Sequence, residues 1–417
     1  MKRVVINGDK KLTGTIRISG AKNAAVALIP AAILTDEEVT ICNVPEISDI
    51  DALEEILEFL NVKVKRATES IIINTKNMKN KSIPEGIAKK LRASYYFMGA
   101  LLAKYKEVEM YFPGGCNIGK RPINIHLDGF KKLGAVIEEK KDKYKIKAEK
   151  LKGANIYLDV ASVGATINLM IVATRAEGTT TIENAAREPE IVNVATFLNS
   201  MGANIKGAGT SIIKIKGVEK LSSGFAEIIP DRIEAGTYTI IGALLGENLK
   251  IDNIIPSHIE ALTSKMKEAG ADIEIGVDYI MCNSKAKLTH TDISTYYFPG
   301  FATDLQQPFS VFLTQCKGKS VITENIYENR FMHVPYLNKM GANIKCNDRK
   351  AIVTGITELK GKKVKATDLR AGAAMIIAGL IAEGRTTIEN AEHILRGYDK
   401  IIEKLVNVGA NIKLIEK

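Results

Sequence analysis

The fold is decided by a stretch that reads Gly202-Ala203-Asn204-Ile205-Lys206, in which a Gly-Ala pair precedes a short apolar strand. The same pair also begins at residues 134, 270, 341 and 409, and Asn61-Val62 takes the corresponding place near the start of the chain. Successive copies are 73, 68, 68, 71 and 68 residues apart. Self-similarity at a fixed period is typical of folds assembled from one repeated unit. The sequence therefore predicts six copies of a unit of about 70 residues.

Each copy predicts the same order of helices and strands. It begins with a helix that is apolar on nearly every face, such as 21–34 or 371–382, and such a helix belongs inside a domain. A strand such as 179–184 follows, and then a helix with apolar residues on one face, as in 191–201. The Gly-Ala strand and a hairpin partner complete the copy. This order predicts an α/β fold, an inside-out α/β prism (barrel) in which sheets and outer helices surround buried central helices.

The two ends of the chain are predicted to meet in one sheet. The last copy ends at Lys417, directly after its Gly-Ala strand, and lacks the hairpin partner. The stretch Val4-Val5-Ile6-Asn7-Gly8, with Leu12 four residues on, resembles the closing strands of other copies. We therefore expect Val4–Ile6 to lie beside the Gly409–Ile412 strand.

This closure predicts two domains of three copies each. The N-terminal domain spans residues 20–229 and carries the loop around Cys116. The discontinuous C-terminal domain joins residues 1–19 to residues 230–417 through a double linker. We expect the active site in the cleft between the domains.

Composition and charge narrow the function classes. The chain has 417 residues, 46% hydrophobic and 25% charged, as in an ordinary globular protein. Its net charge of +10 comes from dispersed lysines, with no tryptophan and 6% aromatic residues, so we expect small anionic substrates and no nucleic acid. Residues 1–9 contain no apolar core of a signal peptide, and the apolar run 371–382 is too short to span a bilayer. The five cysteines are scattered, without metal-ligand spacing. We expect a cytoplasmic protein with no metal, no cofactor and no membrane partner.

A glycine-rich loop carries a candidate reactive thiol. It reads Phe112-Pro-Gly-Gly-Cys116-Asn-Ile-Gly-Lys-Arg-Pro122. Nearby cations lower the pKa of a thiol and increase its reactivity. The loop is also close to a nucleotide-binding Walker A loop, Gly114-x-x-x-x-Gly119-Lys120, but Arg121 stands where that motif needs Ser or Thr for magnesium. A magnesium-dependent nucleotide hydrolase therefore stays as a competing reading, as does a basic module that binds RNA or an acidic partner.

Superposition of the six copies places one position of each at the start of its buried helix. Four of these positions are cations, one is a glycine and one is a carboxylate: Lys22, Arg92, Gly164, Arg232, Asp304 and Arg370. Helix N-termini favour phosphate and carboxylate groups, and acidic residues are the usual preference in a first turn. Four cations at this location therefore indicate a site for anionic substrates.

These motifs resemble those of the UDP-N-acetylglucosamine enolpyruvyl transferases over essentially the whole chain. The matching stretches are Ser19–Asn23, Pro113–Cys116 with Ile118-Gly119 and Arg121-Pro122, Ser162–Thr166, Glu183–Glu190, Thr303-Asp304, Glu328–Val334, Asp368–Ala371 and Arg396–Tyr398. Shikimate-pathway enolpyruvyl transferases share the six-unit fold but not the Gly-Gly-Cys loop, so they are a distant second reading.

The resemblance implies a reaction and a role for each catalytic residue. The enolpyruvyl group of phosphoenolpyruvate would pass to the 3-hydroxyl of UDP-N-acetylglucosamine with release of phosphate, by addition and elimination, as the first committed step of peptidoglycan biosynthesis. Cys116 resembles the acid that protonates the methylene carbon, and Asp304 the base near the sugar hydroxyl. The clamp on phosphate and carboxylate resembles Lys22, Arg121 and Arg396, joined by Arg330 and Arg370. The same resemblance makes the protein a target of fosfomycin.

The resemblance also implies a set of contacts to the sugar nucleotide: Asn23, Arg92, Pro122, Ile123, Asn124, Ile125, Ser162, Val163, Gly164 and Ile326. Asn124 departs from the family's usual Asp beside the uracil contact, so that hydrogen bond is expected to differ. His126 and His333 each lie on a predicted helix among apolar neighbours, and we expect them to have structural roles.

Overall fold

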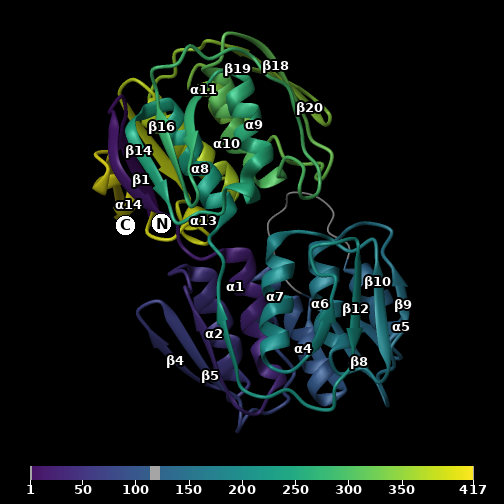
Figure 1. Cartoon of the computed structure of the whole chain (residues 1–417). Helices are drawn as coiled ribbons and strands as arrows, with labels where there is room; N and C mark the ends of the chain where they lie inside the picture. The colour runs from purple at the N-terminus through teal and green to yellow at the C-terminus, as the bar shows by residue number, and fades with distance from the viewer. Residues whose placement is uncertain (1, 113–122, 417) are drawn as a thin grey trace. The chain divides into compact units, whose positions relative to one another are not determined.

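The structure is a computed structural model that describes residues 2–112 and 123–416 (Figure 1). The chain divides into two compact units. One consists of the described residues between Gly20 and Ile229, and the other joins residues 2–19 to residues 230–416. The chain passes from one unit to the other at Ser19-Gly20 and again at Ile229-Pro230. We refer to them as the 20–229 unit and the 230–416 unit.

The 20–229 unit contains three sheets among its described residues, with strand orders β13-β3-β5-β4, β6-β8-β7 and β11-β12-β10-β9. Its elements are α1 (Lys22–Ala31), η1 (Ala32–Leu34), β3 (Glu38–Cys42), α2 (Ser48–Phe59), β4 (Lys63–Ala67), β5 (Ser70–Asn74), α3 (Glu85–Ala88), η2 (Arg92–Tyr95), α4 (Tyr96–Tyr105), β6 (Glu107–Tyr111), α5 (Asn124–Lys132), β7 (Val136–Lys140), β8 (Lys143–Lys147), β9 (Asn155–Tyr157), α6 (Val163–Ala173), β10 (Thr179–Glu183), α7 (Pro189–Ser200), β11 (Asn204–Lys206), β12 (Ile212–Lys216) and β13 (Gly224–Glu227).

The 230–416 unit likewise contains three sheets within the described chain, with orders β15-β16-β14-β2, β17-β18-β20-β19 and β21-β22-β1-β23. Its elements are β1 (Lys2–Asn7), β2 (Leu12–Arg17), α8 (Arg232–Leu245), β14 (Gly246–Asp252), η3 (Pro256–Ile259), α9 (Glu260–Glu268), β15 (Asp272–Ile275), β16 (Tyr279–Asn283), β17 (Ile293–Ser294), α10 (Thr303–Thr314), β18 (Gly318–Thr323), α11 (Val334–Lys339), β19 (Asn343–Asn347), β20 (Lys350–Gly355), β21 (Lys363–Lys365), α12 (Leu369–Ile381), β22 (Arg385–Glu389), α13 (Glu392–Leu395), α14 (Ile401–Asn407) and β23 (Asn411–Glu416).

The N-terminal strand β1 completes the sheet formed by the end of the chain. It lies between β22 and β23 and is antiparallel to both. Val4 pairs with Leu414 and Ile6 with Ile412 in β23, and the Val4 and Ile6 side chains are fully buried. The predicted pairing of the two chain ends is therefore confirmed.

One backbone conformation recurs at the six positions that define the predicted copies. The five glycines of the Gly-Ala pairs have φ between +88° and +111°, and Asn61 has φ of +62°. Each of these residues follows the end of a helix by two positions, as Gly202 follows α7 and Asn61 follows α2. The left-handed conformation at this place ends a helix, and glycine, or less often asparagine, adopts it with little strain. The repeat in the sequence therefore marks a helix stop before each strand.

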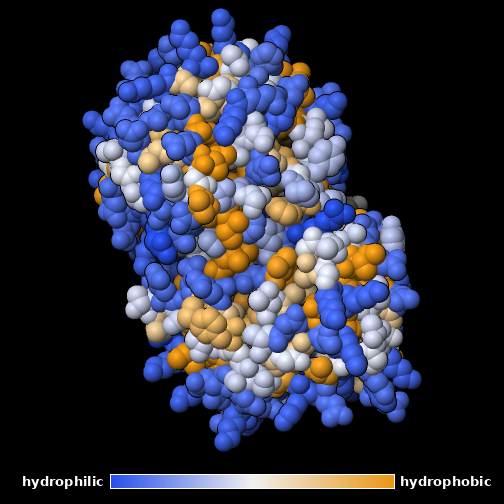
Figure 2. All heavy atoms as spheres, viewed as in Figure 1, coloured by the Kyte–Doolittle hydropathy of each residue, from blue (hydrophilic) through white to orange (hydrophobic). Residues whose placement is uncertain are grey.

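The apolar helices are buried, as predicted. Helix α12 is buried at every residue from Arg370 to Leu380, and it packs on α10, which packs on α8. In the 20–229 unit α4 packs on both α1 and α6. The face of the molecule in Figure 2 is mainly hydrophilic, with small apolar patches among polar residues. The buried helices therefore form the core of each unit, and their first turns position the candidate site.

Candidate active site

The predicted helix-start residues all occupy the first turn of a helical segment. Lys22, Arg92 and Arg232 are the first residues of α1, η2 and α8, whereas Gly164, Asp304 and Arg370 are the second residues of α6, α10 and α12. The 3-10 helix η2 continues directly into α4. The predicted location is therefore confirmed for every copy. Three of the six positions belong to each unit.

Carboxylates cap two of the helices that begin with arginine. Asp231 Oδ1 accepts hydrogen bonds from the backbone N–H groups of Ile233 and Glu234 at 2.8 and 3.0 Å. Asp368 Oδ1 accepts from the N–H groups of Arg370 and Ala371 at 2.9 and 3.0 Å. These caps satisfy N–H groups that a helix N-terminus would otherwise offer to an anion. At α8 and α12 the positive charge available to a substrate therefore comes from the arginine side chains.

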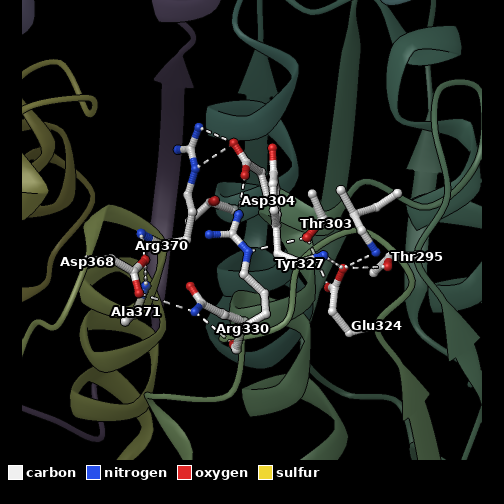
Figure 3. A network of polar contacts seen from close by, with 12 residues as sticks. Thr295, Thr303, Asp304, Glu324, Tyr327, Arg330, Asp368, Arg370 and Ala371 are labelled. Atoms are coloured by element: carbon white, nitrogen blue, oxygen red, sulfur yellow. Dashed lines mark hydrogen bonds and ion pairs between the residues drawn. The ribbon is translucent and has the colours of Figure 1, made fainter. Parts of the chain in front are cut away.

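Asp304 lies between two buried guanidinium groups (Figure 3). Its Oδ2 accepts from Arg370 Nε and Nη2 at 3.1 and 3.0 Å, and its Oδ1 accepts from Arg330 Nη2. The side chains of Arg330 and Arg370 are only 2% and 4% exposed, whereas that of Asp304 is 28% exposed. Burial lowers the pKa of Arg370, but the Asp304 carboxylate raises it by more, so the net shift is upward. The cluster combines an accessible carboxylate with two cations and has a net positive charge.

Aromatic rings hold the two arginines from the other side. The Arg370 guanidinium lies 5.3 Å from the ring centre of Tyr398, and that of Arg330 lies 5.5 Å from the ring centre of Tyr327. Tyr398 is itself fixed by a hydrogen bond of 2.9 Å between its hydroxyl and that of Thr237. Arg396, at the end of α13, is two residues from Tyr398, and α13 packs on α12. The structure therefore places the Arg396 segment next to the Arg370 helix.

The 20–229 unit holds a second set of predicted residues. Lys22 Nζ forms an ion pair of 2.8 Å with Asp49 Oδ2, and the Asp49 side chain is almost fully buried. The partly buried Asn23 follows Lys22 in α1. Ser162 caps α6, because its hydroxyl accepts from the Ala165 N–H at 3.3 Å.

Gly164 brings the start of α6 against η2 and α5. A Cβ atom at this position would lie 2.6 Å from the Tyr95 hydroxyl and 3.2 Å from His126 Cε1, so a larger residue would clash. The Tyr95 and His126 rings are in edge contact at 4.8 Å, and His126 Nδ1 lies 3.1 Å from Asn168 Nδ2. The structure thus brings together the segments of Arg92, of Ile123, Asn124 and Ile125, and of Ser162, Val163 and Gly164.

Both histidines named above are buried and neutral. Burial, with a smaller effect of Arg92, lowers the pKa of His126 to about 3. Burial also lowers the pKa of His333 to about 4, and its Nε2 lies 2.8 Å from the Ser310 hydroxyl. These surroundings support structural roles for the two side chains.

Some predicted residues lie outside the described part of the chain. These are Cys116, Arg121 and Pro122, together with the near-Walker stretch from Gly114 to Lys120. Ile326 is described, and its N–H donates to Glu324 Oε1 at 2.8 Å. In the described ranges, no His, Cys, Asp and Glu side chains gather in a way that could hold a metal ion. Across the same residues, no helix has both the length and the apolar character needed to cross a membrane.

A second polar cluster anchors the end of the N-terminal segment in the 230–416 unit. The Ser19 hydroxyl donates to Asp399 Oδ2 at 2.6 Å and accepts from Lys404 Nζ at 2.7 Å. Lys404 also forms an ion pair with Glu234, which is 2% exposed. Burial raises the pKa of Glu234 to about 7, although Lys404 acts in the opposite direction.

This raised pKa predicts a pH-dependent stability. Because folding raises the pKa of Glu234 from 4.5 to about 7, its contribution to stability is complete below pH 4.5 and is lost as the pH rises through 7. Replacing Glu234 with glutamine should remove a loss on the order of 3 kcal/mol. Thermal unfolding from pH 4.5 to 8 measures the difference between wild type and variant, which should shrink as the pH rises. The exposed Glu247→Gln variant serves as the control, and a difference that is constant with pH would contradict the prediction.

Three residues of the site were not assigned a role from the sequence. Asp49 neutralises Lys22, and Glu324 and Thr303 lie behind the Asp304 cluster. Thr303 immediately precedes Asp304, which is a usable signal. Glu324 directly follows β18 and Asp49 lies in the first turn of α2. Acidic residues are common at such places, so neither had a distinctive signal.

Comparisons with known proteins agree with this arrangement. Residues 6–405 match the family described as EPSP synthase (3-phosphoshikimate 1-carboxyvinyltransferase). The chain is 52% identical to UDP-N-acetylglucosamine 1-carboxyvinyltransferase 2 of Bacillus cereus over 99% of this chain and 96% of the relative. It is 51% identical to the protein of that name from Listeria monocytogenes, over 98% of this chain and 97% of the relative.

Solved structures show the same fold. The enolpyruvyl transferase NikO from Streptomyces tendae superposes with a TM-score of 0.90 at 25% identity, covering 99% of both chains. EPSP synthase from Acinetobacter baumannii superposes with a TM-score of 0.76 at 17% identity, covering 100% of both chains. The second likeness concerns the fold alone.

Proposed function

The chain belongs to the UDP-N-acetylglucosamine 1-carboxyvinyltransferase family of transferase enzymes, and from this premise we propose how its own residues carry out the transfer. The acceptor is the 3-hydroxyl of UDP-N-acetylglucosamine, the donor is phosphoenolpyruvate, and phosphate is released. The observation that carries the proposal is the position of Asp304, an accessible carboxylate held by the two buried guanidiniums of Arg330 and Arg370.

The addition step needs a base and an acid. Asp304 takes the proton of the sugar 3-hydroxyl, and the hydroxyl oxygen forms a bond to C2 of phosphoenolpyruvate. Cys116 delivers a proton to C3, which becomes a methyl group. The 28% exposure of the Asp304 side chain leaves its carboxylate accessible to a sugar hydroxyl.

The elimination step needs charge stabilisation. The bond between C2 and the phosphate oxygen breaks, phosphate leaves, and C3 loses a proton, which restores the double bond. Cations stabilise the negative charge that develops on the leaving phosphate. We assign this role to Lys22, Arg121 and Arg396, with Arg330 and Arg370 contributing to the clamp.

The sugar nucleotide is assigned to the 20–229 unit and to the turn after β18. Arg92, the first turn of α5 and the Ser162–Gly164 segment are adjacent in that unit, which supports a shared binding surface. Ile326 is the contact from the turn after β18, and Asn23 follows Lys22. Asn124 replaces the family's usual Asp in this set.

The larger organisation follows the same proposal. The two compact units would be the two enolpyruvyl transferase domains, each made of three copies of the repeated unit around its buried helices. Six sheets in the described chain, each with the same kind of antiparallel core, support this repeat. We place the reaction in the cytoplasm as the first committed step of peptidoglycan biosynthesis.

Phosphate release tests the proposal. Purified protein should release phosphate from phosphoenolpyruvate only when UDP-N-acetylglucosamine is also present, and without added metal. Release from a nucleoside triphosphate that depends on magnesium would instead support a hydrolase. RNA binding without phosphate release would overturn the enzyme assignment.

A further inference from the structure

A fully buried carboxylate lies directly behind the Asp304 cluster. Glu324 has no exposed surface and follows β18 (Figure 3). Its Oε1 accepts from the Thr295 hydroxyl at 2.9 Å and from the N–H groups of Ile326 and Tyr327 at 2.8 and 3.1 Å. Its Oε2 accepts from the Thr303 hydroxyl at 2.9 Å. A buried carboxylate without an ion pair among these contacts is expensive unless it is well hydrogen-bonded, so this position is demanding.

The two oxygens of Glu324 face different parts of the site. Oε1 fixes the turn that contains Ile326, and Oε2 fixes Thr303, the first residue of α10. The Thr303 hydroxyl also accepts from Arg330 Nε at 3.3 Å. Arg330 in turn donates to Asp304. A continuous hydrogen-bonded path therefore runs from Glu324 through Thr303 and Arg330 to the candidate base.

The direction of these bonds determines what the path can do. The Glu324 carboxylate only accepts, so the Thr303 hydroxyl must donate to it, and the lone pairs of that hydroxyl are then turned toward Arg330 Nε. Arg330 is held a second time through its backbone carbonyl, which accepts from Gln307 Nε2 at 3.0 Å. With the orientation of Arg330 fixed, its Nη2 is aimed at Asp304 Oδ1.

We infer that Glu324 is a positioning residue for the transfer reaction, which acts through Thr303 and Arg330 to set the orientation of the Asp304 carboxylate. It also connects that orientation to the turn that carries Ile326. The inference rests on the proposed role of Asp304 as the base. Misplacement of a reacting group by about 1 Å costs about 100-fold in rate, so loss of this path should reduce kcat.

Thr303 variants test the path. Thr303→Val keeps the shape of the side chain but removes the hydroxyl, and should lower kcat about 10- to 100-fold with KM for UDP-N-acetylglucosamine changed less than about threefold. Thr303→Ser restores the hydroxyl and should recover most of the lost kcat. Glu324→Gln retains an acceptor for the turn but places an NH2 group against Thr303. It should therefore lower kcat in the same way.

Thr295→Val is the matched control. It removes a hydroxyl bonded to the same carboxylate, but on the Oε1 side, away from Arg330. It should lower the melting temperature as Thr303→Val does and leave kcat within about twofold, since Thr295 is not on the path. The inference is overturned if Thr303→Val has wild-type kcat, or if Thr295→Val and Thr303→Val lose kcat equally. The threonine variants keep it falsifiable if Glu324→Gln fails to fold.

Asp304→Asn, assayed in parallel, separates this inference from the proposed function. A fully active Asp304→Asn enzyme would overturn the base assignment, and the positioning role with it. An inactive Asp304→Asn enzyme beside a fully active Thr303→Val enzyme would overturn only the positioning role.

Discussion

Replacement of Asp304 with asparagine is expected to lower kcat by about 100- to 10,000-fold, the usual contribution of a general base. Asparagine has nearly the same shape but does not accept the hydroxyl proton. Its loss of charge also leaves the buried Arg330 and Arg370 guanidiniums without their shared carboxylate. Steady-state phosphate release with saturating substrates measures the effect.

Folding and binding must be measured with the same variant, because unpairing a buried charge can destabilise a protein by about 3–5 kcal/mol. Circular dichroism and calorimetric binding of UDP-N-acetylglucosamine at a temperature below the melting transition address this. Asp272→Asn, an exposed carboxylate in the same unit, is the control and should retain wild-type kcat. A folded Asp304→Asn enzyme with kcat within tenfold of wild type would show that another group is the base.

Changes at Cys116 are expected to separate acid chemistry from inhibition. Cys116→Ser should lose turnover by about 100-fold or more, because a hydroxyl is too weak an acid to deliver the proton to C3. Cys116→Asp should retain activity, since a carboxylic acid also donates a proton. The same variant should resist a phosphonate epoxide such as fosfomycin, which needs the thiolate as its nucleophile.

The other cysteines are internal controls for the alkylation. Burial raises the pKa of Cys282 and of Cys316 to about 12, and it also raises the pKa of Cys346. Their thiolates are therefore scarce at neutral pH, and peptide mass mapping should find the adduct on Cys116. An adduct on another cysteine, or full activity of Cys116→Ser, would refute the assignment of the acid.

Local and periodic features of this protein were predictable from the sequence. The positive φ at Gly202 and its counterparts, including Asn61, follows from a backbone conformation that glycine and asparagine adopt with little strain. Burial of α12 follows from a helix that is apolar on every face. The pairing of β1 with β23 followed from a missing strand in the last copy. Each of these properties depends on residue type at a fixed spacing, which a sequence records directly.

The contacts of the site were decided by the tertiary structure. Spacing placed Asp304 and Arg370 at equivalent helix starts, but it did not indicate that both arginines would bind one carboxylate. Likewise, Lys22 is neutralised by Asp49 from the next helix, and Glu324 reaches Arg330 only through Thr303. The physical reason is that the strength of an ion pair or a buried hydrogen bond depends on distance and desolvation. Packing of separate elements sets both quantities, and no periodicity in the chain encodes them.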